Sequence, residues 1–141
     1  MSAQEIFKLM NENPVFYFAT ADGDQPRVRG MLLFKADENG IVFHTGSNKE
    51  VFAQIKQNPK AEMCFSANGV QIRATGILEQ SSDEKLRDEI FAHPTRQFLH
   101  SPAWKESGMA QTLQIFVMKN CTAVTWTMET NFAEKDVITL C

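Results

Sequence analysis

The sequence has no excess of basic charge, no long apolar run and no glycine motif for nucleotides. Its 14 lysine and arginine residues are outnumbered by 17 aspartate and glutamate residues, which gives a formal charge of −3. Such a chain has no positive field that would collect nucleic acid or acidic lipid without sequence preference. We therefore expect no nucleic-acid partner, and any bound anion must be held by a local cluster of donors.

Membrane and export signals are also lacking. No apolar run approaches the ~18 residues that a membrane-spanning helix needs, and the first ten residues have neither a basic leader nor a long apolar core. Cys64, Cys121 and Cys141 are odd in number and far apart, without a CxxC spacing. This pattern argues against a disulfide framework and against a zinc site. We expect a cytoplasmic protein with buried or incidental thiols, no membrane partner and no metal.

The composition is that of one folded domain covering residues 1–141. Hydrophobic residues make up 43% and charged residues 22% of the chain, close to the averages for soluble globular proteins. A chain of this length can bury a core but is short for two domains. Neither GxGxxG nor GxxxxGK[ST] occurs, which disfavours a Rossmann-type nucleotide site.

Strand signals dominate the chain, and helical patterns interrupt them. Residues 2–12, 47–57 and 82–93 have helical periodicity, and a proline follows closely after each. Strands are predicted at 15–20, 27–34, 41–45, 60–65, 70–80 and 111–128, the last being one long bent strand or two strands broken near Lys119 and Asn120. Residues 94–110 contain two prolines and show no clear period, so we expect a loop or short helical turns there, over a site. The pattern indicates a mainly β fold, an antiparallel sheet that closes into a small barrel with flanking helices.

The stretch FHTGSNKEVF, residues 43–52, joins a predicted strand to a predicted helix and has two interpretations. SNKE matches a capping box, in which Ser47 accepts from the Glu50 amide and the Glu50 carboxylate reaches back. Alternatively, the free amides at the helix start, two hydroxyls and the Lys49 ammonium form a receptor for a phosphate. Arg27 and Arg29, on one face of the preceding strand, would supply a second cation, unless that face is simply solvated. The residues alone leave both interpretations open.

Four segments in a particular order carry a family resemblance. RVRGMLLF (27–34), GIVFHTGSNK (40–49), NPKAEMCF (58–65) and VQIRATG (70–76) together resemble the pyridoxamine-phosphate oxidase-like family, the FMN-binding split barrels. The likeness runs from about Pro14 to Leu78 and is looser afterwards. It implies a six-stranded antiparallel split β-barrel that forms a homodimer, with the FMN site at the subunit interface.

The resemblance also implies roles for individual residues. Arg29, Ser47 and Lys49 would hold the FMN phosphate, and Asn48 stands where a basic residue is common in the oxidases, so this phosphate site has less charge. Glycine allows close approach of a ligand to the backbone. Six further residues would lie along the isoalloxazine ring and ribityl chain: Gly30, Met31, Leu32, His44, Thr45 and Gln71.

The implied function is that of an FMN-dependent oxidoreductase acting on an unidentified small molecule, with NAD(P)H or a similar donor supplying the hydride. No residue presents itself as a nucleophile or general base, which suits flavin chemistry because the cofactor carries the reaction. The final segment FAEKDVITLC lacks the tryptophan and arginine-rich motif of the vitamin-converting oxidases, so oxidation of vitamin B6 is not expected. Trp104 is either a lid or a loop anchor. The alternatives are a non-catalytic protein that stores or senses flavin or haem, and a structural domain without a cofactor.

Overall fold

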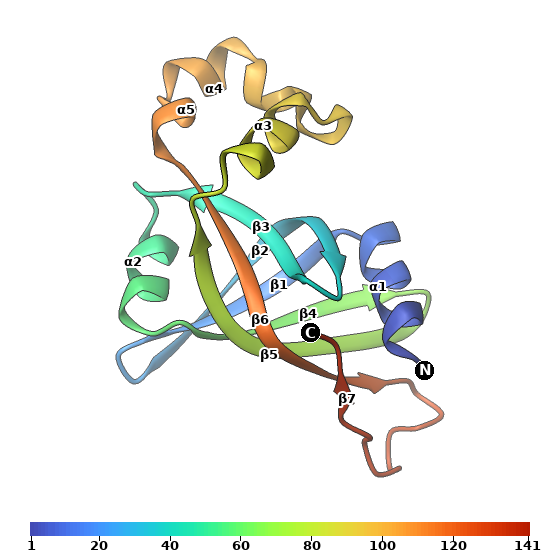
Figure 1. Cartoon of the computed structure of the whole chain (residues 1–141). Coiled ribbons are helices and arrows are strands. Elements are labelled where there is room, and N and C mark those ends of the chain that lie inside the picture. The colour runs from blue at the N-terminus through green and yellow to red at the C-terminus, as the bar shows by residue number, and fades with distance from the viewer.

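A closed antiparallel barrel forms the centre of the computed structural model, which describes all 141 residues (Figure 1). The strands follow the order β3-β2-β1-β4-β5-β6-β7, and an additional pairing of β3 with β6 closes the barrel. All pairings are antiparallel. The strands are β1 (Val15–Asp22), β2 (Gln25–Asp37), β3 (Gly40–Gly46), β4 (Lys60–Ala67), β5 (Val70–Ser81), β6 (Leu113–Trp126) and β7 (Ile138–Thr139). The predicted six-stranded split barrel is thereby confirmed.

The helices flank the barrel in three places (Figure 1). α1 (Ala3–Glu12) precedes β1, and α2 (Glu50–Gln57) connects β3 to β4. A helical segment between β5 and β6 contains α3 (Glu84–Ala92), the 3-10 helix η1 (Pro94–His100), α4 (Pro102–Glu106) and α5 (Met109–Thr112), all gathered at one end of the molecule. None of these helices has both the length and the apolar character that crossing a bilayer requires.

Alternation along the strands builds the core. In β1, Phe16 and Phe18 are fully buried while Val15 and Tyr17 are exposed, as expected for side chains that point to opposite faces of a strand. The ring of Phe16 stacks on that of Phe65 with centroids 5.1 Å apart. A second, smaller apolar cluster lies between the helical segment and the outer face of the barrel, and consists of Val42, Ile90, Leu99, Leu113 and Ile115.

Local details differ from the prediction at element ends. The last predicted strand is one continuous element with a bulge, where Asn120 has a φ of 51°. α3 begins at Glu84 because the Asp83 side chain accepts hydrogen bonds from the amides of Lys85 and Leu86. Residues 94–110 form short helical turns, which was one of the two expectations for this segment.

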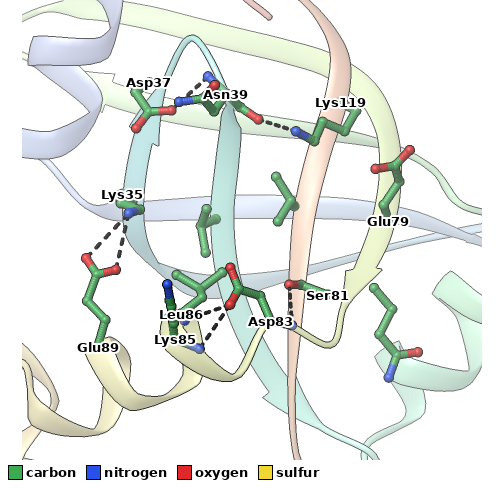
Figure 2. A pocket seen from close by; sticks show the side chains of 13 residues that line it. Lys35, Asp37, Asn39, Glu79, Ser81, Asp83, Lys85, Leu86, Glu89 and Lys119 are labelled. Carbon is green, nitrogen blue, oxygen red and sulfur yellow. Dashed lines mark hydrogen bonds and ion pairs between the residues drawn. The ribbon is translucent and has the colours of Figure 1, made fainter.

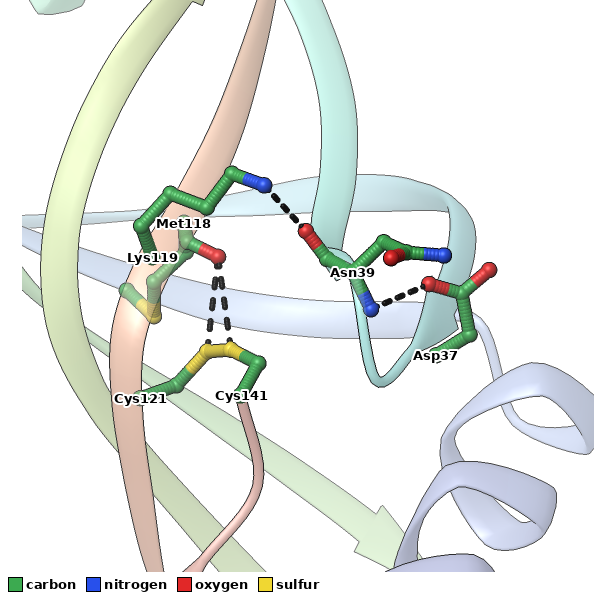
Figure 3. The surroundings of a disulfide bond; sticks show 6 residues. All are labelled: Asp37, Asn39, Met118, Lys119, Cys121 and Cys141. Atoms are coloured by element: carbon green, nitrogen blue, oxygen red, sulfur yellow. Dashed lines mark hydrogen bonds between the residues drawn. A yellow bond between two sulfur atoms is a disulfide. The ribbon is translucent and has the colours of Figure 1, made fainter.

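The expectation of incidental thiols is wrong for two of the three cysteines. Cys121 and Cys141 form a disulfide, with their Cα atoms 5.0 Å apart (Figure 3). β7 returns antiparallel along β6, with Thr139 opposite Thr122, and this places the C-terminal residue beside Cys121. Cys64 remains a free thiol. Sequence spacing gave no signal because the pairing depends on the return of the chain.

Candidate functional site

Three polar or charged side chains are buried in the whole chain: Thr20, Gln54 and Arg96, with 4%, 7% and 1% of their surface exposed. Buried polar groups are costly unless they are hydrogen-bonded. Thr20 and Gln54 both bind Arg29, and Arg96 binds His44. The three buried polar side chains therefore all bind Arg29 or His44, two of the residues that the sequence predicted for the site.

Arg29 is held on three sides. Its Nη1 donates to Thr20 Oγ1 at 2.7 Å and to the Phe18 carbonyl at 3.2 Å. Its Nη2 donates to Gln54 Oε1 at 2.7 Å, and that oxygen also accepts from the Thr20 hydroxyl at 2.7 Å. Thr20 follows Phe16 and Phe18 on the inward face of β1, and Gln54 shares the buried side of α2 with Val51 and Ile55. The guanidinium is thus fixed where α2 meets the barrel.

The electrostatic surroundings of Arg29 favour a negative ligand. Burial lowers the pKa of Arg29 from its ordinary value, the positive charge of Arg27 lowers it further, and the charge of Glu50 raises it. Burial and a like charge both disfavour the charged form. A bound anion would offset both effects.

Next to Arg29 the barrel is split. The pairing of β2 with β3 covers Leu33 to Asp37 only, whereas residues 25–32 of β2 pair with β1 alone. One main-chain edge of Gly30, Met31 and Leu32 therefore has no strand beside it. A Cβ atom placed on Gly30 would meet nothing within 4 Å. An open strand edge with space above it can accept the polar rim of a planar ligand through main-chain hydrogen bonds.

The start of α2 lies at the same end of the barrel. The capping-box interpretation of SNKE is wrong, because Lys49 is the N-cap residue and makes no side-chain cap bond. The Ser47 amide instead donates to the Thr112 carbonyl at 2.8 Å. The first amides of α2 are consequently free of side-chain partners, and the positive end of the helix dipole is available to an anion. Ser47 and Lys49 lie in the turn that leads into α2, and their role as phosphate ligands stays a prediction.

Trp104 of α4 lies beside this loop. A small cavity of about 270 Å³ is lined by Asn48, Lys49, Trp104, Met109 and Thr112 among others. The Trp104 ring packs against Phe98, with centroids 5.1 Å apart, and keeps 38% of its surface exposed. The helical segment therefore reaches the predicted phosphate loop. The packing on Phe98 agrees with the role of an anchor for Trp104, and the role of a lid stays a prediction.

His44 contacts the other buried arginine. Arg96 Nε donates to His44 Nε2 at 2.8 Å, and Arg96 Nη2 donates to the Leu33 carbonyl at 2.9 Å. Burial of the imidazole, followed by the charge of Arg96, lowers the pKa of His44 from 6.5 to about 4. His44 is therefore neutral at ordinary pH.

The remaining predicted residues are spread over three locations. Met31 faces inward and packs against the core, and Leu32 faces outward beside Val15. Thr45 lies near the end of β3, paired with Gln114 of β6. Gln71 is exposed on β5, separated from β2 by β1 and β4. Three strand spacings amount to about 14 Å, so Gln71 does not join the Arg29 cluster within one chain.

The largest surface cavity lies elsewhere. It has a volume of about 470 Å³ and is bounded by α3 and the outer faces of β2, β3, β5 and β6 (Figure 2). Several of its polar groups already bind one another: Lys35 pairs with Glu89 at 3.4 Å, and Asp37 accepts from the Asn39 amide at 2.8 Å. We do not assign a ligand to this cavity, because its charges are exposed and largely matched.

Sequence reasoning missed Thr20, Gln54 and Arg96. For Thr20 a signal existed, since a polar residue follows two phenylalanines at the alternate positions that face inward. For Gln54 the signal was a polar residue on the apolar side of a helix, between Val51 and Ile55. Arg96 lies in a segment without periodicity, and nothing local marks it as buried.

A family model described as "Pyridoxamine 5'-phosphate oxidase" matches residues 2–126. The chain belongs to this family. Among curated relatives, the pyridoxine/pyridoxamine 5'-phosphate oxidase of Pelagibacter ubique is 33% identical over 86 residues, which are 59% of this chain and 41% of the relative. The chain spans less than half the length of that family member.

Solved structures share the fold at low sequence identity. A NimC/NimA family protein from Clostridium acetobutylicum superimposes with a TM-score of 0.76 and 22% identity, over 98% of this chain and 93% of that one. A haem-binding protein from Mycobacterium smegmatis gives 0.70 and 14%, over 99% and 58%. An FAD-binding protein from Mesorhizobium loti gives 0.66 and 16%, over 90% and 96%. Proteins with different printed names, among them a haem-binding and an FAD-binding protein, therefore share this fold.

Proposed function

We propose that this protein binds FMN and is a flavin-dependent oxidoreductase acting on a small molecule. The observation that carries the proposal is the open edge of β2 at Gly30, Met31 and Leu32, which lies directly beside the fixed guanidinium of Arg29. A planar ring with a polar rim suits the edge, and a phosphate suits the arginine. Membership of the oxidase family and the FAD-binding neighbour support a flavin as the ligand.

The phosphate would be held by Arg29, Lys49, the Ser47 hydroxyl and the first amides of α2. Arginine offers a planar fork of donors, and the helix start adds main-chain donors with a partial positive charge. Asn48 supplies no charge, so two cations carry the electrostatic part of the binding. FMN is preferred over riboflavin in this proposal because riboflavin leaves both cations unmatched.

The ring would lie along Gly30 to Leu32, with His44 and Thr45 at the end of the neighbouring strand. When bound, the flavin would supply the chemistry by accepting and donating a hydride. The chain's own contribution is to orient the cofactor, to hold its phosphate and to shield one side of the ring. His44 is neutral at ordinary pH, because burial and the charge of Arg96 lower its pKa to about 4.

A second copy of the chain would complete the site. Val15, Tyr17 and Val28 have 60%, 58% and 68% of their surface exposed and share the outward face of β1 and β2. Gln71 is exposed too, so a partner subunit packed against the barrel could present it to the cofactor. We propose a two-fold homodimer in which the flavin lies at the interface between subunits.

A visible spectrum of the purified protein tests the proposal. A flavin gives an absorption band that bleaches when reduced nicotinamide is added without oxygen, as expected for a flavin that exchanges hydride. A flavin that stays oxidised supports the second candidate, a protein that only binds or senses its cofactor. A haem Soret band would support the haem form of that candidate, which the Mycobacterium smegmatis neighbour favours.

A further inference from the structure

Arg96 lies against a bulge in β2. The register between β2 and β3 shifts between Leu33 and Lys35, so Phe34 is an extra residue on β2. A bulge leaves a main-chain group without its ladder partner. Here the Leu33 carbonyl accepts from Arg96 Nη2 at 2.9 Å, and the guanidinium lies 5.3 Å from the centroid of the Phe34 ring. The bulge therefore fixes the guanidinium in place.

The Nε donor of Arg96 determines which ring nitrogen of His44 carries the proton. An arginine side chain has donors only, so a nitrogen that faces it must accept. Arg96 Nε lies 2.8 Å from His44 Nε2, and Nε2 consequently carries a lone pair. We propose that Arg96 is a positioning residue that holds His44 as the neutral Nδ1–H tautomer, so that the imidazole offers a hydrogen-bond donor, and not a base, to a ligand beside β2 and β3.

The surroundings of the imidazole agree with this assignment. No buried side-chain nitrogen or oxygen in the protein lacks a hydrogen-bond partner, and Nδ1 of His44 has none within the chain, so it is open to the surface. On η1 the charged group that faces the ring is Arg96, while His93 is turned to Thr95 and to the Phe34 ring. β6 places the apolar Ile115 opposite. No carboxylate stabilises the imidazolium.

The tautomer of His44 determines which ligand groups the imidazole can bind, and this step rests on the proposed flavin site. Whatever meets Nδ1 has to accept a hydrogen bond, as a carbonyl oxygen or an unprotonated ring nitrogen does. A ligand group that needs to lose a proton finds no acceptor at His44. Arg96 thereby limits His44 to orientation and recognition, although the residue type is the commonest general base in enzymes.

The tautomer is measurable in the protein without ligand. Long-range 1H–15N NMR spectra of 15N-labelled protein distinguish the two neutral tautomers and the imidazolium for each of the three histidines, and His44→Gln assigns the signals of His44. We expect His44 to be protonated at Nδ1 and unprotonated at Nε2 from pH 8 to pH 5. His93 and His100 serve as internal references. A His44 signal protonated at Nε2 in the parent protein would overturn the proposal without the need for any variant.

Two variants separate positioning from packing. In Arg96→Met the fixed donor is gone, so His44 should populate the Nε2–H tautomer and its pKa should rise toward 6.5, the ordinary value for a histidine. Arg96→Lys keeps a cationic donor and should restore part of the Nδ1–H population. Arg87→Met is the control, because Arg87 binds the Leu113 and Ala110 carbonyls in the same helical segment and does not touch His44. An unchanged tautomer in folded Arg96→Met would contradict the proposal.

Adding FMN distinguishes this inference from the proposed function. If FMN binds, the Nδ1–H resonance of His44 should move, and the Nε2 signal should stay that of an acceptor. If FMN does not bind and the free protein still shows the Nδ1–H tautomer, the flavin proposal fails and the role of Arg96 stands. If FMN binds to a protein whose His44 is protonated at Nε2, the flavin proposal stands and the role of Arg96 fails.

Discussion

Arg29 and Gln54 are 25 residues apart in the sequence and are joined by a hydrogen bond of 2.7 Å from Nη2 to Oε1. The bond connects β2 to α2, the helix whose first turn carries the other half of the proposed phosphate site. It fixes the direction of the guanidinium before any ligand arrives, which lowers the entropy cost of binding.

The first prediction concerns the phosphate. Arg29→Ala and Lys49→Ala should each cost about 1.5 to 3 kcal/mol of FMN affinity, the range for hydrogen bonds to charged groups. Riboflavin, which lacks the phosphate, should bind weakly to the parent protein and should be nearly indifferent to both changes. Isothermal titration with the two ligands measures this. Lys56→Ala, at the other end of α2, is the control of equal charge. Equal losses for FMN and riboflavin would show that the two residues act through folding.

The second prediction concerns Gln54. Gln54→Leu removes the acceptor shared by Arg29 and the Thr20 hydroxyl, so two donors lose a partner at a buried site. The free energy of unfolding should fall by about 1 to 3 kcal/mol, and FMN should bind less tightly because Arg29 is no longer oriented. Urea unfolding and FMN titration measure the two effects. Gln57→Leu, an exposed position on the same helix, should change neither. A stable Gln54→Leu protein with full FMN affinity would refute the orienting role.

Most of the fold could be predicted because local signals and tertiary structure agree. The inward phenylalanines of β1 alternate with exposed residues, and the prolines after α1, α2 and α3 terminate helices where the structure ends them. The start of α2 could not be predicted from SNKE, because the Ser47 amide is bound by the Thr112 carbonyl. That contact comes from α5, 65 residues away, and leaves no mark near residue 47.

The buried polar contacts of the site could not be predicted from the sequence. Arg29 was predicted from the residues and His44 from the family resemblance, yet their pairing with Gln54 and Arg96 became visible only in three dimensions. A hydrogen bond between distant residues requires two orientations that neither local sequence specifies. The disulfide between Cys121 and Cys141 is a similar case, since the antiparallel return of β7 creates it.

The third prediction is a pH dependence of stability that originates at His44. Its pKa is about 4 in the folded protein against an ordinary value of 6.5, so between these values the unfolded chain binds a proton that the folded chain does not. The stabilisation is complete above about pH 6.5 and is lost as the pH falls toward 4, by roughly 1.4 kcal/mol per pH unit at most.

Urea unfolding of the parent protein and of His44→Gln at pH 7 and pH 4.5 measures this contribution. The stability difference between the two proteins should shrink by about 2 kcal/mol on acidification. His100→Gln, which changes an exposed histidine, is the control, and its stability should change between the two pH values as that of the parent protein does. A difference between parent and His44→Gln that is independent of pH would contradict the lowered pKa.

The fourth prediction concerns the disulfide. Reduction, or Cys141→Ser, should lower the free energy of unfolding by about 2 to 4 kcal/mol, because the bond closes a loop between residues 20 positions apart. FMN affinity should be unchanged, since β7 is joined to β6 at Thr122 and Ala123, whereas β3, the strand before α2, pairs with the other part of β6, from Leu113 to Met118. Urea unfolding with and without reductant measures the loss. Cys64→Ser is the control, and a Cys64→Ser protein that alone becomes insensitive to reductant would refute the pairing.

The last prediction is that dimerisation and FMN binding are coupled through the outward face of β1 and β2. Val28→Asp places a charge on this face at a position with 68% of its surface exposed, so the fold of one subunit should be unaffected. Burying an unpaired carboxylate in an interface is costly, so the variant should dissociate and lose FMN together. Val137→Asp is the matched control, because its side chain is equally exposed and lies outside this face.

Since FMN would bind the assembled state more tightly than separate chains, it should also raise the melting temperature and oppose dissociation on dilution. Sedimentation velocity of the apo and FMN-loaded proteins over a dilution series measures the coupling, and a monomer that retains stoichiometric FMN at every concentration would rule out the shared site.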